Sequence, residues 1–357
     1  MNFTLFGYPK TGKTTLFNLL TGAKIEVKAY ENGKKEPNLR THPVPDPRLE
    51  KIWSLYSEKE KKPATVDFID LAGISFGEVK STTYLNYLRQ ADGLTHVARG
   101  FIDAQIPHPK GKISPEEDIH SMEDELTLSD LVSIESRLEK LEKELKRAKN
   151  PEGEREKELL LQLRSLLEKG QALREAELSP EEGKLISSFA FLSQKSLIHM
   201  INVDEKDIPL IENPEKIYSS QKKGVTTAAF CGKIEAEIME LEDEERETFL
   251  SEYNLKELSA PKFLKASYDL LQAITFFTIG KDEVKAWTVR GNTTALKAAG
   301  VIHSDIEKGF IRAEVIPWKD LLEFGSFKNA KEKAAVRLEG KEYNVQDGDV
   351  IYFRFSN

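Results

Sequence analysis

The sequence has little of what secreted, membrane-spanning or thiolate-metal proteins need. Cys231 is the only cysteine among 357 residues, which excludes an intrachain disulfide and a multi-cysteine metal site and suits a reducing compartment. No apolar run is long enough to span a bilayer. The chain opens with a strand-like run at residues 2–6 in place of a leader peptide. We therefore expect a cytoplasmic protein with no membrane partner.

An excess of positive charge is also missing. The formal net charge of −8 argues against a molecule that coats nucleic acid, because non-specific affinity comes from neutralising phosphates. We expect no DNA partner. Residues 275–357 differ, with 13 basic and 12 acidic side chains, so we expect any contact with RNA or a ribosome in this near-neutral segment.

Aromatic residues are scarce between residues 125 and 182, where Leu, Glu, Lys and Arg dominate. Apolar residues recur there at three- and four-residue spacing, in two stripes separated by Asn150-Pro151-Glu152-Gly153. The stripes consist of Leu131, Ile134, Leu138, Leu141 and Leu145, and of Leu159, Leu163, Leu166 and Leu173. This pattern predicts an antiparallel, coiled-coil-like helical hairpin inserted at residues 121–185. The alternative is a helical pair buried in a larger core.

Mixed α/β patterns flank the hairpin and favour a mainly parallel sheet, in a nucleotide-binding domain made of residues 1–120 and 186–274. Its strands are expected at residues 3–6, 64–69, 94–98, 197–201 and 226–230. Residues 275–357 are expected to form a separate, mostly antiparallel β domain with one helix. The strands of that domain are expected at 275–279, 284–289, 311–315, 336–338, 342–345 and 350–355.

The first motif with chemical meaning is Gly7-Tyr8-Pro9-Lys10-Thr11-Gly12-Lys13-Thr14, which matches the P-loop pattern G-x-x-x-x-G-K-[ST]. It follows a predicted strand and precedes a predicted helix, so its backbone N–H groups and the helix N-terminus would surround phosphates. We expect Lys13 to reach the β- and γ-phosphates as a catalytic cation, and Thr14 to ligate Mg²⁺. The residues expected to bind nucleotide here are Pro9, Lys10, Thr11, Gly12, Lys13, Thr14 and Thr15.

A second predicted strand ends in Asp70-Leu71-Ala72-Gly73, the D-x-x-G arrangement. In that arrangement the carboxylate holds Mg²⁺ and the glycine senses the γ-phosphate, so Asp70 is expected to be the metal-side partner of Thr14. Alone, Asp-x-x-Gly is usually a strand-to-loop turn. Ile74 stands where Ras-type GTPases place the glutamine that orients the attacking water. Hydrolysis is therefore slow or absent, or another polar group takes part.

The base-reading element is expected at Asn202-Val203-Asp204-Glu205, after a later strand. Guanine readers use N-K-x-D, whereas here Val203 replaces the lysine and Glu205 is one methylene longer than aspartate. Such a mismatch of buried polar groups discriminates strongly between bases, so Asn202, Val203 and Glu205 point away from GTP. An ordinary polar loop is the alternative.

With these motifs in order, the chain resembles the YchF-type ATPases, an Obg-related branch of the translation-factor GTPases, along its whole length. The matching stretches are AWTV at 286–289, AAGVIH at 298–303, EKGFIRAEV at 307–315, VQDGDV at 345–350 and PVPDPRL at 43–49. The resemblance implies a G domain interrupted by a helical hairpin and a C-terminal TGS domain of the β-grasp type. It further implies ATP as the preferred substrate, through an N-x-x-E element, and association with ribosomes.

By the same resemblance, His108 falls where the family has a loop histidine proposed to assist hydrolysis. Alone, a histidine between two prolines is more often an ordinary loop residue. The chain departs from the family at Lys10 and Thr11, where the family has Asn and Val. It departs again at residues 33–35, which offer no switch threonine for Mg²⁺, and at residues 75–80, which replace a Gly- and Lys-rich loop.

The motifs together favour an ATPase, with Mg²⁺ as cofactor, that uses slow hydrolysis as a conformational switch on a ribosome or RNA partner. A nucleotide-gated binding module with negligible turnover is the main alternative, because Ile74 and the altered switch segments suit it. A GTPase is disfavoured by Val203 and Glu205. A small-molecule kinase is disfavoured because no acceptor lid is evident before Asp70.

Overall fold

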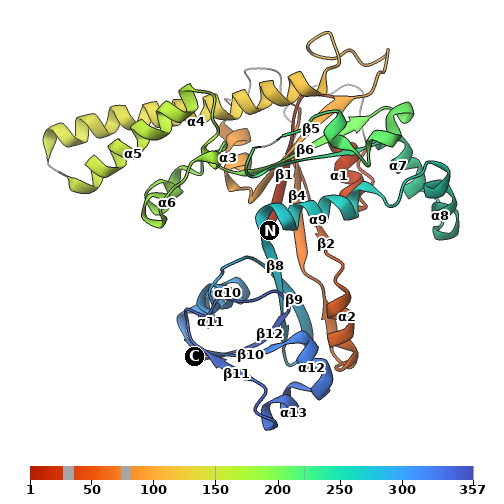
Figure 1. Cartoon of the computed structure of the whole chain (residues 1–357), viewed down its shortest axis with the longest axis vertical. Helices are drawn as coiled ribbons and strands as arrows, with labels where there is room; N and C mark the ends of the chain where they lie inside the picture. Colours follow the sequence, from red (N-terminus) through yellow and green to blue (C-terminus); the bar gives the residue numbers. More distant parts are fainter. Residues whose placement is uncertain (27–35, 74–81, 149, 221, 357) are drawn as a thin grey trace. The chain divides into compact units, whose positions relative to one another are not determined.

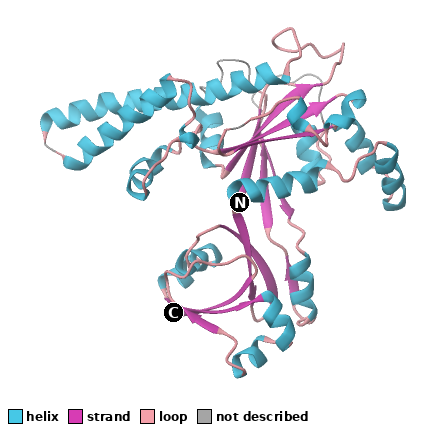
Figure 2. Cartoon of the chain, viewed as in Figure 1, coloured by secondary structure: helices cyan, strands magenta, loops and turns pink. Residues whose placement is uncertain are grey.

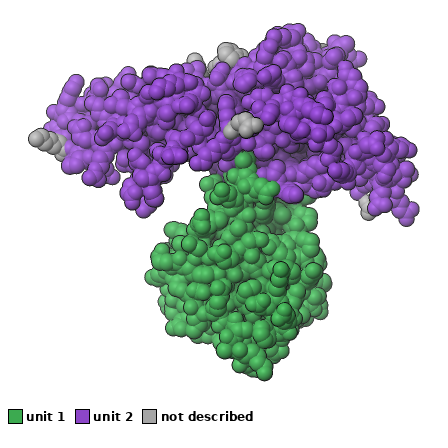
Figure 3. Space-filling model, viewed as in Figure 1, with its two compact units in different colours: residues 1, 41–67, 267–357 green, residues 2–40, 68–266 purple. Residues whose placement is uncertain are grey.

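The computed structural model describes residues 1–26, 36–73, 82–148, 150–220 and 222–356. The chain divides into two compact units, shown in different colours in Figure 3. The larger unit comprises residues 2–40 and 68–266, and the smaller unit comprises residues 1, 41–67 and 267–357. Within the described residues, no helix is both long and apolar enough to cross a bilayer.

The larger unit is built around a six-stranded sheet with helices packed on it (Figures 1 and 2). Strands β1, β5, β6 and β7 pair in parallel in that order, and the first three of them are mostly buried. The predicted mainly parallel α/β fold is therefore confirmed. Across the sheet, the strands are β2 (Asn38–Pro43), β4 (Thr65–Asp70), β1 (Asn2–Phe6), β5 (Gly93–Gly100), β6 (Ser196–Val203) and β7 (Val225–Phe230).

Helices connect these strands and bury their apolar faces against the sheet. Two separate clusters of buried side chains cover it, one around Phe6, Leu94 and Leu197, the other around Ala98, Ile201 and Ile234. The helices of this unit are α1 (Lys13–Thr21), α3 (Thr82–Gln90), α4 (Pro115–Arg147), α5 (Pro151–Glu168), α6 (Pro180–Ile186), α7 (Gly232–Met239), α8 (Asp243–Glu252) and α9 (Ser259–Leu271).

Helices α4 and α5 lie side by side and project from the sheet, as Figure 1 shows, so the predicted helical hairpin is confirmed. Asn150 caps α5 by accepting a hydrogen bond from the Glu152 N–H at 3.1 Å. Both predicted stripes contribute to one apolar cluster, although Leu173 lies in a 3₁₀ turn beyond α5. Helix α4 begins before the expected insertion. The apolar side chains of its first turns pack in the two clusters that cover the sheet, so these turns belong to the core of the larger unit.

The smaller unit has a second, mixed sheet, with strands in the order β11-β10-β12-β8-β9-β3. Four short helices lie in the described C-terminal residues, so the expectation of one helix is wrong. The expected strand at 342–345 is also wrong: these residues form a turn, in which Asn344 makes only an isolated bridge to Thr294. The strands are β3 (Glu60–Lys62), β8 (Ala273–Ile279), β9 (Glu283–Arg290), β10 (Phe310–Pro317), β11 (Arg337–Glu339) and β12 (Asp349–Phe355). The helices are α2 (Pro47–Ser54), α10 (Ala295–Ile302), α11 (Ser304–Lys308), α12 (Trp318–Phe324) and α13 (Phe327–Glu332).

Residues 41–67 belong to this smaller unit, whereas the boundaries expected from the sequence leave them with residues 1–120. Strand β3 pairs in parallel with β9, and Leu49 and Ile52 of α2 are buried in the same cluster as Phe277. Arg48 joins two of the family-like stretches, since its guanidinium contacts Asp46 at 2.8 Å and Asp347 at 2.6 Å. The PVPDPRL stretch thus has a structural role in this unit.

Candidate nucleotide-binding site

A cavity of about 1230 Å³ lies at the carboxyl ends of the parallel strands in the larger unit. Its wall comes from the loop before α1, the end of β4, the loop after β5, the end of β6 and the start of α7. Open α/β sheets bind ligands at this edge, outside the carboxyl ends of the strands. The size suits a nucleotide.

Two glycines give the loop before α1 its shape. Gly7 has φ of +142°, and a Cβ there would lie 2.7 Å from the Val97 carbonyl oxygen. Gly12 has φ of +95°, and a Cβ there would lie 2.2 Å from the Asn202 side-chain nitrogen. Only glycine meets both constraints. Helix α1 starts at Lys13 immediately afterwards, so its first N–H groups face the cavity edge as an anion site.

Lys13 is almost buried, and its ammonium donates to the Tyr8 carbonyl oxygen at 2.6 Å. Gly73 packs closely against the same part of the loop. A Cβ on Gly73 would lie 2.4 Å from the Pro9 Cα and 3.1 Å from the Lys13 Nζ. The glycine of D-x-x-G therefore lies against the P-loop itself. A lysine cation between these two segments is placed to interact with a bound phosphate group.

Thr14 and Asp70 meet as the sequence predicts. The Thr14 hydroxyl donates to Asp70 Oδ2 at 2.8 Å, and the Asn38 amide donates to the same oxygen at 3.1 Å. Asp70 is buried at the end of β4. A hydroxyl and a carboxylate are hard oxygen donors of the kind that Mg²⁺ prefers, and Mg²⁺ usually completes its shell with water and phosphate oxygens. This pair fits that ion.

At the other end of the cavity, Asn202 ties two loops together. Its amide nitrogen donates to the Thr11 carbonyl at 3.2 Å, and its amide oxygen accepts from the Gly232 N–H at 2.9 Å. Val203 lines the cavity, but its side chain belongs to the buried cluster around Ile201. Glu205 is the exposed acid of the motif, and its carboxylate is 2.9 Å from the Lys233 ammonium.

His108 does not line the cavity in the described structure. Its Nε2 lies 2.8 Å from Asp118 Oδ2 of α4, and both side chains are buried. Its ring packs edge-to-face on Tyr8 at 6.2 Å between centroids, while the Lys110 ammonium lies 5.2 Å from the Tyr8 ring centroid. Burial raises the pKa of Asp118, although His108 and Lys110 oppose that rise. His108 therefore contacts the P-loop by packing on Tyr8, outside the cavity.

A buried polar chain that the sequence does not reveal runs from beneath the P-loop to α4. Parallel pairing sets His96 of β5 beside His199 of β6, with 3.2 Å between their Nδ1 atoms. His199 Nε2 lies 3.2 Å from Glu123 Oε1, and Lys222 and Arg174 complete the cluster around that carboxylate. Burial lowers the pKa of both histidines.

The protons on the buried histidines of this series are placed by the charged side chain at its end, Glu123. Burial alone would raise the pKa of Glu123, but hydrogen bonds from His199 and Lys222 bring it to about 2, so the carboxylate is ionised. Ionised Glu123 accepts from His199 Nε2–H, which leaves His199 Nδ1 to accept from His96 Nδ1–H. His96 Nε2 is then an unprotonated nitrogen, close to Gly7 of the P-loop.

Comparisons with known proteins agree with this geometry. Residues 2–137 match the family described as 50S ribosome-binding GTPase. Residues 273–356 match YchF-GTPase_C, described as a protein of unknown function. The "Ribosome-binding ATPase YchF" of Bacillus subtilis is 39% identical to the chain, over 99% of the chain and 98% of that protein.

The chain belongs to the YchF family. The Haemophilus influenzae protein of the same name is 41% identical, again over 99% of the chain and 98% of that protein. One solved structure that matches is titled "Structure of the Schizosaccharomyces pombe YchF GTPase". Its TM-score is 0.81 at 28% sequence identity, and the match covers 99% of this chain and 97% of the chain in that structure. YchF membership confirms the resemblance drawn from the sequence.

In this YchF-family chain, most residues expected at the site line the cavity. Those that do are Pro9, Lys10, Gly12, Lys13, Thr14, Thr15, Asp70, Asn202, Val203 and Glu205. Thr11 is buried, and its hydroxyl donates to the Tyr8 carbonyl at 3.2 Å. Residues 33–35, Ile74 and residues 75–80, which carried the switch arguments, lie outside the described residues.

Proposed function

We propose that this chain is a ribosome-associated ATPase that binds ATP at the P-loop cavity and hydrolyses it slowly, in preference to GTP. The 2.8 Å contact between Thr14 and Asp70, at the N-terminus of α1, carries the proposal. It joins the two motifs on which P-loop hydrolases depend, P-loop and D-x-x-G, in one site. The curated relatives are named ribosome-binding ATPases along almost the same length.

Phosphate binding follows from the chain's own groups. Lys13 would leave the Tyr8 carbonyl for the β- and γ-phosphates, since an ammonium gains more from phosphate oxygens than from a neutral carbonyl. The N–H groups at the start of α1 would hold the same phosphates. Thr14 and Asp70 would hold Mg²⁺, directly or through water, and this ion supplies neutralising charge for the transferred phosphoryl group.

The base end favours ATP because the features that guanine needs are absent from the motif. Both polar atoms of the Asn202 amide already bond the backbone of Thr11 and Gly232. Val203 brings no lysine, and the Glu205 carboxylate is longer than aspartate and paired with Lys233. Guanine N1–H and N2–H₂ would have no well-placed free acceptor, which costs affinity.

His108 assists hydrolysis in this proposal only after a rearrangement. In the described structure it is buried between Asp118 and Tyr8, away from the cavity. Separating this pair leaves a buried Asp118 with Lys110 as its remaining close cation, and that cost suits a slow intrinsic rate. Residues 101–106, which precede the histidine, already line the cavity in part.

The proposal extends to the partner and the location. The smaller unit is the proposed ribosome- or RNA-docking part, of TGS type. Ribosome association would place the protein in the compartment that holds ribosomes.

Calorimetric titrations with ATP and GTP, each with and without Mg²⁺, test the proposed site. We expect tighter binding of ATP, and weaker binding of ATP when EDTA replaces Mg²⁺. Equal or tighter binding of GTP would overturn the assigned preference.

A further inference from the structure

One face of the sheet in the smaller unit is only half covered. Glu314 of β10 pairs with Leu338 of β11 on one side and with Tyr352 of β12 on the other, while Arg312 pairs with Arg354. Directly opposed side chains point to the same side of a sheet, as do residues two apart in one strand. These five residues therefore share one face, which we call the open face.

Next to the open face, the sheet is covered on both sides. The next pair along the same face, Ile316 and Val350, is buried with Leu321 of α12. On the opposite face, Ala313 and Phe353 are buried together with residues of α10. Coverage thus stops at the row of Glu314, and the open face is bounded by α12 and α13.

The open face presents an exposed aromatic ring and an exposed arginine. Tyr352 is 53% exposed and Leu338 is 59% exposed. Arg312 is exposed beside them. As far as the structure describes the chain, the side chains of Arg312 and Tyr352 form no hydrogen bond, ion pair or ring contact, and they are not held by the fold.

The charge of the open face is opposite to that of the whole chain. Its single carboxylate, on Glu314, is buried and carries two cations: Lys331 at 3.0 Å, and Arg354 in close contact. With Arg312 this leaves three cations around one neutralised acid, on a chain of formal charge −8. Lys328, one helical turn before Lys331 in α13, is also exposed.

We propose that the open face binds single-stranded RNA, with Tyr352 stacking on a base and Arg312 contacting phosphate; this inference rests on the proposed ribosome association and names its RNA-contacting surface. Unpaired RNA bases stack on exposed aromatic side chains of sheet faces, and cations beside them bind the phosphate backbone. The cations around one neutralised carboxylate favour a polyanion as the partner of this face.

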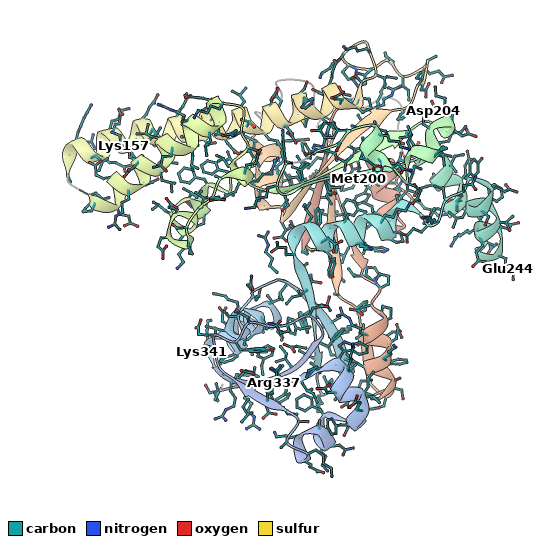
Figure 4. All side chains as sticks on the ribbon, in the orientation of Figure 1. Lys157, Met200, Asp204, Glu244, Arg337 and Lys341 are labelled. Atoms are coloured by element: carbon teal, nitrogen blue, oxygen red, sulfur yellow. The ribbon has the colours of Figure 1, made fainter. Side chains whose placement is uncertain are left out.

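Point variants are preferable to removal of the unit. Deleting the chain after Ala273 would expose Leu49 and Ile52, whose buried neighbours lie in the deleted part. Tyr352 and Arg312 are exposed, so replacing them leaves the core intact. Lys341, labelled in Figure 4, is the matched charge control. Its carbonyl accepts from Leu296 of α10, which places it by the opposite face.

The assay is fluorescence anisotropy of a labelled oligouridine, with the full-length protein at several KCl concentrations. Tyr352→Ala should weaken binding at least about 5-fold, because one stacked base contributes about 1–3 kcal/mol, while Tyr352→Phe should bind as the parent does. Arg312→Gln should lower the slope of log affinity against log salt by about 0.7. Lys341→Gln should leave that slope unchanged.

Co-sedimentation with ribosomes separates this inference from the function on which it rests. If the parent sediments with ribosomes and Tyr352→Ala reduces that as well as oligouridine binding, the open face is the RNA contact. Sedimentation that Tyr352→Ala and Arg312→Gln leave unchanged would overturn the open face alone. If the variants lose co-sedimentation but the parent does not bind oligouridine, the open face contacts a protein partner. That result would also overturn RNA binding by the open face. A parent that never sediments would overturn the proposed ribosome association.

Discussion

The buried carboxylate of Glu123 makes the most quantitative test of the polar chain beneath the P-loop. Glu123→Gln keeps the size of the side chain and removes its charge, which leaves Lys222 and Arg174 without their anion. The shift of its pKa from 4.5 to about 2 corresponds to about 3 kcal/mol of folding free energy. We therefore expect the variant to lose about 3 kcal/mol at pH 7.

The pH dependence has a definite sign. The folded-state pKa of Glu123 lies below its ordinary value, so its contribution is complete above pH 4.5 and is lost as the pH falls toward 2. The difference between parent and variant should be constant from pH 7 to pH 5 and shrink below that. Asp124→Asn, which alters the neighbouring exposed carboxylate on α4, is the matched control and should change little.

The assay must report on the larger unit. Trp53, Trp287 and Trp318 all lie in the smaller unit, so tryptophan fluorescence follows that unit. Helical circular dichroism in urea instead follows the larger unit, whose longest helices are α4 and α5. We expect Glu123→Gln to move the dichroism transition and to leave the fluorescence transition in place. A loss below about 1 kcal/mol at pH 7, or one that persists unchanged at pH 2, would refute the reasoning.

Three further substitutions probe the P-loop. Lys13→Ala should abolish measurable triphosphate binding in calorimetry, because it removes the cation that faces the phosphates; retained binding would make the loop purely structural. Gly12→Ala should weaken ATP binding at least about 100-fold, since its Cβ would lie 2.2 Å from Asn202 at φ of +95°; near-parental affinity would show that Asn202 does not brace the loop. By resemblance to the family, Lys10 replaces an asparagine that helps bind a monovalent cation, and its ammonium would supply the same positive charge. Hydrolysis by the parent should therefore be the same in K⁺ and in Na⁺, whereas the Lys10→Asn variant should be activated by K⁺. Clear K⁺ stimulation of the parent would contradict that assignment.

Local motifs in the sequence predict the phosphate end of the site. A P-loop needs its glycines, its lysine and its threonine within eight consecutive residues, so Gly7–Thr14 carries nearly the whole arrangement. The Asp70 contact was predictable because a D-x-x-G motif ends a strand beside β1. The hairpin was predictable too, since its apolar spacing repeats over many turns.

Features that depend on distant pairing were not predictable. His96 and His199 are 103 residues apart and meet only through the register of β5 and β6. Neither histidine stands in a recognisable pattern. Residues 41–67 pair with β9 through β3, and nothing in their composition indicates that partner. The structural role of Asn202, whose amide bonds two loops, also depends on the folded chain.

The most direct test of the central claim is single-turnover hydrolysis of ATP and of GTP by the purified protein, with and without ribosomes. We predict slow hydrolysis of ATP at a rate that ribosomes change, slower hydrolysis of GTP, and no hydrolysis by Lys13→Ala. GTP hydrolysis as fast as that of ATP, or no ATP turnover in either condition, would contradict it.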